Sequence, residues 1–309
     1  MSASVAVRKP KQRKGDLVFS GTTRVAGLLI LAALAGVAVF LTAEGLPAIH
    51  APSSELHGAS NIATYVWPLL YGTLLAALIA LLLATPLAIG VALVISHYAP
   101  RRLAKPIGYV IDLLAAVPSV VYGLWGIGFL GVALVPVYQW LAEHAGWIPL
   151  FAGPASITGR TILTAGIVLA IMVLPIITAI TREIFSQTPR LHQEAALALG
   201  ATRWEMIRLA VLPYARSGII SAVMLGLGRA LGETMAVAMV LSANGVVTVN
   251  LLGNTNPSTI AANIALQFPE STGLEVNALI ASGLVLFVIT FVVNFAARAI
   301  VARSEKRLA

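Results

Sequence analysis

The chain has 309 residues, of which 59% are hydrophobic and only 10% are charged. A soluble domain carries roughly 25% charged residues, so this composition excludes an ordinary soluble protein and indicates an integral membrane protein. The formal net charge of +8 could suggest binding to nucleic acid. The positive residues lie at the ends of apolar segments, however, and this distribution argues against it. There is no cysteine, so neither disulfides nor thiol chemistry is expected.

Six apolar runs are long enough to cross a bilayer as helices, which need about 20 residues each. Their approximate ranges are 25–43, 66–96, 107–137, 161–181, 217–241 and 277–298. The second and third runs exceed this length, so we expect them to tilt, bend or extend past the bilayer, with Pro86 and Pro118 as the bend points. The sequence thus predicts an all-α integral membrane fold, with a basic tail over 1–24 and a single membrane domain over 25–309.

The basic residues are distributed unevenly between the two sides of these runs. Of the 20 Lys and Arg residues, 18 lie before the first run, within 101–105, within 182–216, or from the last residue of the final run onward, whereas 44–65 and 242–276 contain none. Because positive residues favour cytoplasmic loops, both termini are expected to be cytoplasmic. The 242–276 loop is rich in turn-forming residues and is expected outside, either solvated or facing an external partner.

The longest basic loop contains the segment Glu194–Pro213, EAALALGATRWEMIRLAVLP. Its pattern predicts two short helices separated by Gly200. Thr188 is expected to cap the first helix, with Pro189 at its first position. Thr202 and Glu205 have the spacing of a capping box at the start of the second helix, and Pro213 is expected to end it.

This segment resembles the "EAA" loop of ABC-importer permeases, in which E-A-A is followed by a glycine after three residues and by I-x-L-P after nine more. The matching positions are Glu194, Ala195, Ala196, Gly200, Leu212 and Pro213, whereas Ala210 replaces the usual isoleucine. In that family the loop is the coupling helix that sits in a groove of a separate ATPase subunit. An amphipathic surface hairpin with no special role is the alternative interpretation.

The fifth run contains two ionisable residues, Arg229 and Glu233, within LGLGRALGETMAVAMV. Their spacing of four predicts a shared helix face, and ionisable groups at such a depth rarely face lipid. Three glycines, Gly226, Gly228 and Gly232, are expected to allow close helix contact. The pair could fix packing internally. Alternatively, Arg229 lines a pathway and attracts an anion, while Glu233 holds Arg229 in place and limits how tightly the anion binds.

The Arg-x-x-Gly-Glu segment resembles the oxyanion branch of these permeases, and Gly232–Val237 is similar to the phosphate-specific PstC type. Asp112–Gly126, DLLAAVPSVVYGLWG, resembles the phosphate permeases at nearly every position. The resemblance covers roughly 20–305. It implies a type-I ABC importer (MetI-like) permease fold, with a core over about 66–300 and a coupling loop over 182–216.

The same resemblance implies an assembly in the cytoplasmic membrane: a second permease subunit of PstA type in a heterodimer, two copies of a cytoplasmic ATPase, and an extracytoplasmic phosphate-binding protein. The chain itself has no Gly-Lys pair and hence no P-loop. We therefore expect a non-catalytic subunit without a cofactor, which imports inorganic phosphate with ATP hydrolysed by its partner. A permease for sulfate or molybdate, or an ion-coupled secondary transporter, is the alternative.

A few polar residues carry weaker expectations. Asp112 is expected to be a helix-start charge near the cytoplasmic interface, and Ser119 could satisfy carbonyls that Pro118 leaves free. The outer-loop histidines His50, His57 and His144 have no ligand spacing, so no metal site is expected.

Overall fold

The computed structural model describes residues 14–52, 54, 56 and 59–305, and this part of the chain is predominantly helical, with no named strand. Six helices in the described residues are long and apolar enough to cross a membrane: Gly15–His50, Ile62–Tyr98, Ser119–His144, Ile162–Ser186, Arg203–Leu231 and Leu274–Ala299. The predicted all-α fold with six spans is therefore confirmed.

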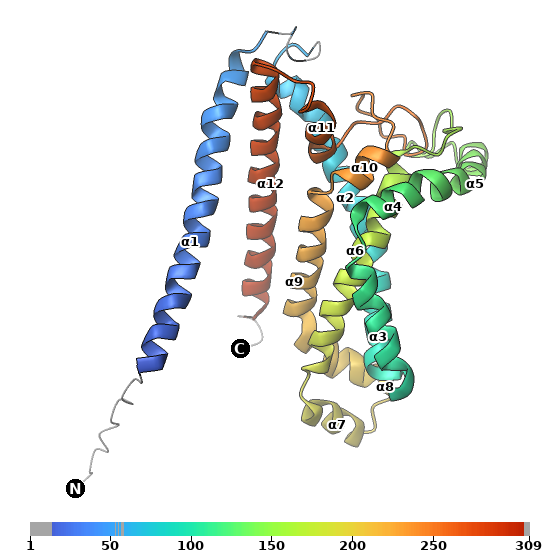
Figure 1. Cartoon of the computed structure of the whole chain (residues 1–309). Coiled ribbons are helices and arrows are strands. Elements are labelled where there is room, and N and C mark those ends of the chain that lie inside the picture. The colour runs from blue at the N-terminus through green and yellow to red at the C-terminus, as the bar shows by residue number, and fades with distance from the viewer. Residues whose placement is uncertain (1–13, 53, 55, 57–58, 306–309) are drawn as a thin grey trace.

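The helical elements, in chain order, are α1 (Lys14–Gly45), the 3-10 turn η1 (Leu46–His50), α2 (Ile62–Leu93), the π turn η3 (Val94–Tyr98), α3 (Arg101–Ala115), α4 (Ser119–Trp125), the π turn η4 (Gly126–Leu130), α5 (Gly131–His144), α6 (Ile162–Ser186), α7 (Arg190–Ala198), α8 (Arg203–Met206), the π turn η5 (Ile207–Val211), α9 (Leu212–Leu231), α10 (Met235–Val240), α11 (Ile260–Gln267) and α12 (Leu274–Glu305). The beginning of α1 and the end of α12 point toward the same end of the molecule as α7 and α8 (Figure 1).

Small residues let α2 pack closely against the central helix α6. Ala80, Ala84 and Ala88 of α2 are fully buried. On α6, a Cβ added at Gly166 would lie 2.5 Å from a methyl carbon of Ile79, so only glycine fits the present packing. Close backbone approach through small side chains is the usual way in which membrane helices associate.

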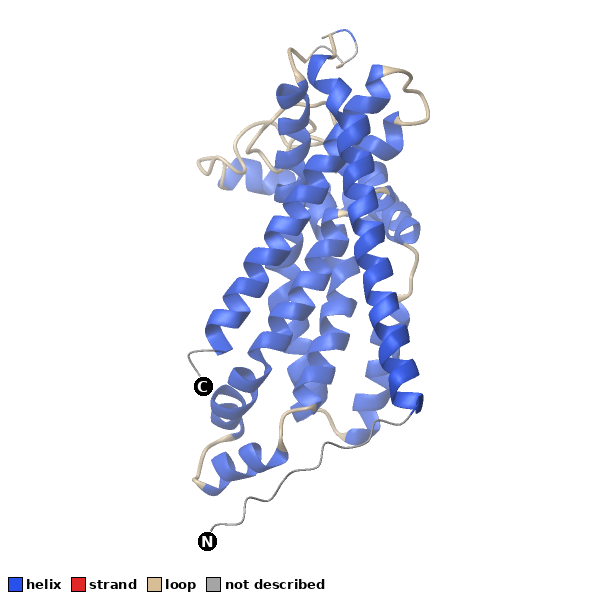
Figure 2. Ribbon diagram, turned by 90° about the vertical axis from the view of Figure 1, so that its left-hand side faces the viewer, coloured by secondary structure: helices blue, strands red, loops and turns tan. Residues whose placement is uncertain are grey.

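Helix α1 stands at the edge of the bundle, beside α12 (Figures 1 and 2). It begins at Lys14, so the first span starts well before the expected residue 25. The polar residues Thr22 and Thr23 are accommodated because both hydroxyls donate to the carbonyl of Phe19, at 2.9 and 2.8 Å. The rest of the expected basic tail, residues 1–13, lies outside the described part of the chain, as does His57.

The third apolar run is divided rather than bent. Pro118 separates α3 from α4, so the expected continuous span over 107–137 is wrong and the membrane-length helix is Ser119–His144. The hydroxyl of Tyr122 donates to the Leu114 carbonyl at 2.9 Å across this break, a task expected of Ser119. Figure 1 shows α4 and α5 turning away from the direction of α3. In contrast, α2 continues through Pro86 without interruption.

The loop predicted over 242–276 is more than a solvated connection. It contains α11 and folds back onto the bundle, where Leu252 and Ile260 are fully buried. The side chain of Asn256, which is also fully buried, donates to the carbonyls of Arg160, Ser242 and Gly253 and accepts from the Ile162 N–H. These bonds fix the loop to the beginning of α6.

Candidate permeation and coupling sites

The predicted fifth span is interrupted between its two ionisable residues. Arg229 lies in the last turn of α9, which ends at Leu231 with Gly232 as its C-cap. Glu233 lies beyond this end, in the short connection to α10. The two side chains therefore do not share a face of one continuous helix, contrary to expectation. Glycine has a low helix propensity, which makes Gly232 a suitable end point.

The carboxylate of Glu233 serves the beginning of α10 and not Arg229. Glu233 is only 8% exposed and accepts a hydrogen bond from the Ala236 N–H at 3.0 Å. A side-chain acceptor at this position satisfies one of the donors that a helix start leaves unpaired. Among the described residues there is no ion pair between Arg229 and Glu233, so the expected role of Glu233 in holding Arg229 is wrong for this structure.

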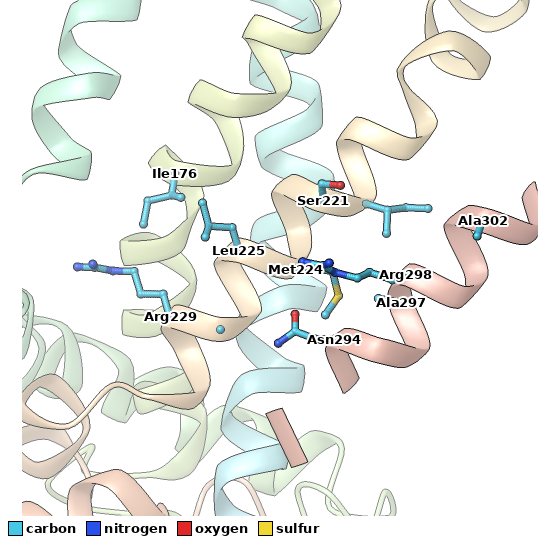
Figure 3. Close-up of a pocket in the computed structure, with 11 residues that line it drawn as sticks. Ile176, Ser221, Met224, Leu225, Arg229, Asn294, Ala297, Arg298 and Ala302 are labelled. Carbon is cyan, nitrogen blue, oxygen red and sulfur yellow. The ribbon is translucent and has the colours of Figure 1, made fainter. Parts of the chain in front are cut away.

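Arg229 is exposed and lines a groove of about 800 Å³ between α9 and α12. The polar groups that share this groove are Ser221, Asn294 and Arg298. In Figure 3 the guanidinium group of Arg229 points away from Asn294 and Arg298. Because no carboxylate in the described residues pairs with Arg229, its charge is available to an anion.

The three glycines of the fifth run behave differently from one another. A Cβ at Gly226 would lie 2.8 Å from the Ile177 side chain, so the predicted close contact with α6 is confirmed there. Gly228 has open space around it, and at Gly232 the nearest atom is a backbone oxygen of its own helix end at 3.6 Å. Gly228 instead lines the groove beside Arg229.

The predicted helical hairpin is present as α7 followed by α8. Gly200 separates the two helices with a φ of +84°, a left-handed conformation that favours glycine. Thr202 and Glu205 form the predicted capping box, since the Thr202 N–H donates to Glu205 Oε2 at 2.8 Å and the Glu205 N–H donates to Thr202 Oγ1 at 3.3 Å. The turn is therefore defined by its own residues.

Two expected boundaries of the hairpin are wrong. Thr188 does not cap α7: it is buried in the turn that ends α6, Pro189 is the N-cap, and no side-chain bond caps α7. Pro213 does not end the second helix, because α8, η5 and α9 run on continuously from Arg203 to Leu231. The π turn shifts the hydrogen-bond register just before Pro213, at a position where a missing N–H is tolerated.

The hairpin is attached to the bundle on one side and open on the other. Phe185, Met206, Ile207 and Val211 form a buried cluster against which Ala196 and Leu212 of the EAA pattern pack. The remaining EAA residues Glu194, Ala195, Gly200 and Pro213 are exposed. Together with Leu199, which is 90% exposed, most of them border a groove of about 1020 Å³ on the free side of the hairpin.

The sequence analysis missed two interactions near these sites. Asp112 lies in the last turn of α3, not at a helix start, and forms an ion pair with Arg182 of α6. Arg160 donates to the carbonyls of Met239 and Leu241 at the end of α10, at 3.3 Å each. For Arg160 a signal was available, since it is one of two basic residues outside the positively charged loops.

Residues 84–308 match the family of binding-protein-dependent transport system inner membrane components. The chain belongs to this family. Its curated relatives include the phosphate transport system permease protein PstC 2 of Mycobacterium tuberculosis, with 46% identity over 96% of this chain and 95% of the relative. The PstC of Mesorhizobium japonicum is 40% identical over 94% of this chain and 91% of its own length. The predicted membership of the PstC-type permeases is thus confirmed.

Solved structures support the fold of this family member. The MetNI methionine ABC transporter, solved in inward-facing conformations, aligns with a TM-score of 0.51 at 18% identity, over 77% of this chain and 94% of the other. A bacterial ABC transporter involved in the import of the acidic polysaccharide alginate aligns with a TM-score of 0.58 at 17% identity, over 94% of this chain and 96% of the other. The predicted MetI-like permease fold is confirmed, and the protein is a multi-pass membrane protein of the ABC permease class.

Proposed function

We propose that this chain is a permease subunit of an ATP-driven importer that moves inorganic phosphate across the cytoplasmic membrane. The observation that carries the proposal is identity of 46% over nearly the full length to a permease named for phosphate transport. The exposed Arg229, which has no carboxylate partner among the described residues, suits this substrate because a guanidinium fork matches pairs of phosphate oxygens.

The proposal includes partners that the family resemblance implies. A second permease subunit of PstA type completes a heterodimeric path, and an extracytoplasmic phosphate-binding protein delivers the ion. Two copies of a cytoplasmic ATPase receive the α7–α8 hairpin, whose exposed groove supports this docking. Both termini are then cytoplasmic, because the beginning of α1 and the end of α12 lie toward the hairpin end (Figure 1). The chain itself is non-catalytic and binds no cofactor.

The mechanism follows from these elements. ATP binding closes the ATPase pair and moves the hairpin, whose attachment to α2 and α6 through the buried cluster transmits the movement. The path opens outward, phosphate passes Arg229, and ATP hydrolysis restores the inward-facing state. A cation on the path lowers the barrier for an anion, provided that binding stays weak enough for release.

Uptake of labelled phosphate into vesicles that hold this chain with its partners tests the proposal. ATP-dependent uptake that excess sulfate or molybdate leaves unchanged supports it. Inhibition by either competitor would leave the proposed architecture in place and would indicate that the substrate is another oxyanion. Vesicles that hold this chain alone provide the second control, since ATP-independent uptake by them would indicate an ion-coupled secondary transporter.

A further inference from the structure

A cleft of about 580 Å³ lies between η3, α3, the end of α6 and the beginning of α7. It shares no lining residue with the groove between α9 and α12 or with the groove on the free side of the hairpin. Its cationic side chains are Lys105, Arg182 and Arg190, and its carboxylates are those of Asp112 and Glu183. Neither permeation nor docking of the ATPase accounts for this cleft.

The positive charges of the cleft are only partly compensated. Asp112 is engaged by Arg182 in an ion pair, and the Glu183 carboxylate accepts a hydrogen bond from the Gln187 side chain at 3.4 Å. Lys105 and Arg190 are exposed and form no ion pair with any described residue. Because Lys105 lies on α3 and Arg190 on α7, the cleft offers an anion one unpaired cation from each of two separate elements.

Thr188, which also lines the cleft, carries a polar group that the fold itself does not use. The residue is only 3% exposed, and its hydroxyl has no hydrogen-bond partner within the described part of the chain. A buried hydroxyl without a partner is unfavourable. Valine has nearly the same shape as threonine, so packing alone would favour valine at this position. A ligand that pairs with the hydroxyl accounts for the threonine.

The beginning of α7 adds backbone donors at the same place. The helix starts at Arg190, and no side-chain bond caps it. The side chain of Gln193, which lines the cleft, donates to the Thr188 carbonyl at 3.2 Å. An uncapped helix start attracts anions, since its first N–H groups are unpaired and the helix dipole is positive there. Guanidinium, ammonium, hydroxyl and backbone N–H groups together form a donor set suited to a phosphate group.

The surroundings of the cleft combine basic and lipid-facing residues. On α3, the large apolar side chains of Leu103, Val110 and Leu113 are exposed near the cationic Lys105. Figure 1 shows the beginning of α3 at the same end of the molecule as α7 and α8. Basic pockets between helices at the cytoplasmic face of a membrane protein are sites that attract anionic headgroups.

We propose that this cleft binds an anionic phosphate group on the cytoplasmic side of the membrane, with Lys105, Thr188 and Arg190 as its ligands. The group comes from an anionic phospholipid headgroup or from free inorganic phosphate, which share this chemistry. The cytoplasmic placement rests on the proposed function. A bound phosphate group joins α3 to the beginning of α7, and so holds the hairpin at a second place besides the buried cluster around Phe185.

Amide hydrogen exchange over residues 186–195 tests the site without requiring transport. The permease–ATPase complex carries Arg229→Gln, so that phosphate on the permeation path does not contribute, and is held without nucleotide in nanodiscs of phosphatidylcholine. One arm adds inorganic phosphate, and the other includes phosphatidylglycerol in the bilayer. The arm that supplies the ligand should slow exchange about tenfold at ten times the dissociation constant, and thereby identifies the source. Potassium chloride at matched ionic strength should not slow it.

Variants of the cleft separate a specific site from general attraction of anions. Thr188→Val removes the hydroxyl at nearly constant shape, and Arg190→Gln removes an unpaired charge; each should abolish the slowing. Without added ligand, Thr188→Val should exchange like its parent, because the hydroxyl has no partner among the described residues. Arg203→Gln is the matched control, since Arg203 is an exposed cation on α8 outside the cleft, and it should retain the slowing. No slowing in either arm, or equal slowing in all these variants, would overturn the site.

The same experiment separates this inference from the proposed function. Should phosphate uptake fail while either arm still slows exchange only where the cleft is intact, the site stands and the substrate assignment fails. Should uptake be ATP-dependent and specific for phosphate while neither arm slows exchange, the proposed function stands and the site fails.

Discussion

Asp112 and Arg182 form an ion pair, with 3.4 Å between Oδ2 and Nη2, that joins the end of α3 to α6. Gly108, one turn before Asp112, makes room for it, since a Cβ there would overlap the Arg182 guanidinium. The two side chains are 49% and 26% exposed, so solvent screens their attraction. An exposed pair of this kind contributes about 0–1 kcal/mol, which suggests that it fixes the position of α3 more than it stabilises the fold.

We expect Asp112→Asn to lower the free energy of unfolding by less than about 1 kcal/mol. A double-mutant cycle with Arg182→Gln, followed by thermal unfolding in detergent, should give a coupling energy of the same small size. Gly108→Val should cost more than either change, because the added side chain displaces the guanidinium from α3. A coupling energy above about 3 kcal/mol would instead indicate a desolvated pair.

Gly200→Val should weaken association with the ATPase. The position has a φ of +84° and open space around it, so the penalty arises from backbone conformation and not from a clash. Gly200→Asn is the matched control, because asparagine tolerates the left-handed conformation better than β-branched residues do. Co-purification with the ATPase and stimulation of ATP hydrolysis are the measurements. Equal results for the two variants would mean that this turn does not set the docking surface.

Thr202→Ala should destabilise the start of α8 by about 1 kcal/mol, since it removes one half of the capping box. The hydroxyl accepts from the Glu205 N–H at 3.3 Å and donates to the Glu205 carboxylate at 2.8 Å. Thr202→Ser retains both bonds and serves as the control. Amide hydrogen exchange over the hairpin should be faster only in the alanine variant. Unchanged exchange would show that packing beneath α8 holds the turn by itself.

The sequence predicted those features that depend on local rules. Apolar runs predicted the six spans, and the break between two helices at Gly200 and the Thr202–Glu205 capping box follow from residue types at fixed spacing. Even at the hairpin, the expectation that Pro213 ends the second helix was wrong. The preceding π turn shifts the hydrogen-bond register so that proline fits within the helix, and no local sequence pattern predicts this turn.

The parts that sequence could not predict depend on contacts between distant segments. A spacing of four suggested that Arg229 and Glu233 share a helix face, but the chain breaks at Gly232 because α10 finds partners on α4 and in Arg160, far away in sequence. Likewise, Arg182 reaches Asp112 over 70 residues. Pairings of this kind follow from the packing of the bundle, which periodicity does not determine.

Arg229→Gln should sharply reduce phosphate uptake while the complex still assembles. The side chain is exposed and makes no ion pair within the described part of the chain, so its loss removes a charge from the path without leaving a buried group unpaired. Arg229→Lys should retain part of the uptake with weaker apparent affinity, because lysine keeps the charge but not the planar fork.

Arg298→Gln is the matched control, because Arg298 lines the same groove. In Figure 3 the Arg229 side chain points away from Arg298, so loss of the Arg298 charge should leave uptake near that of the wild type. Normal uptake by Arg229→Gln, or an equal loss in Arg298→Gln, would contradict a specific place for Arg229 on the path.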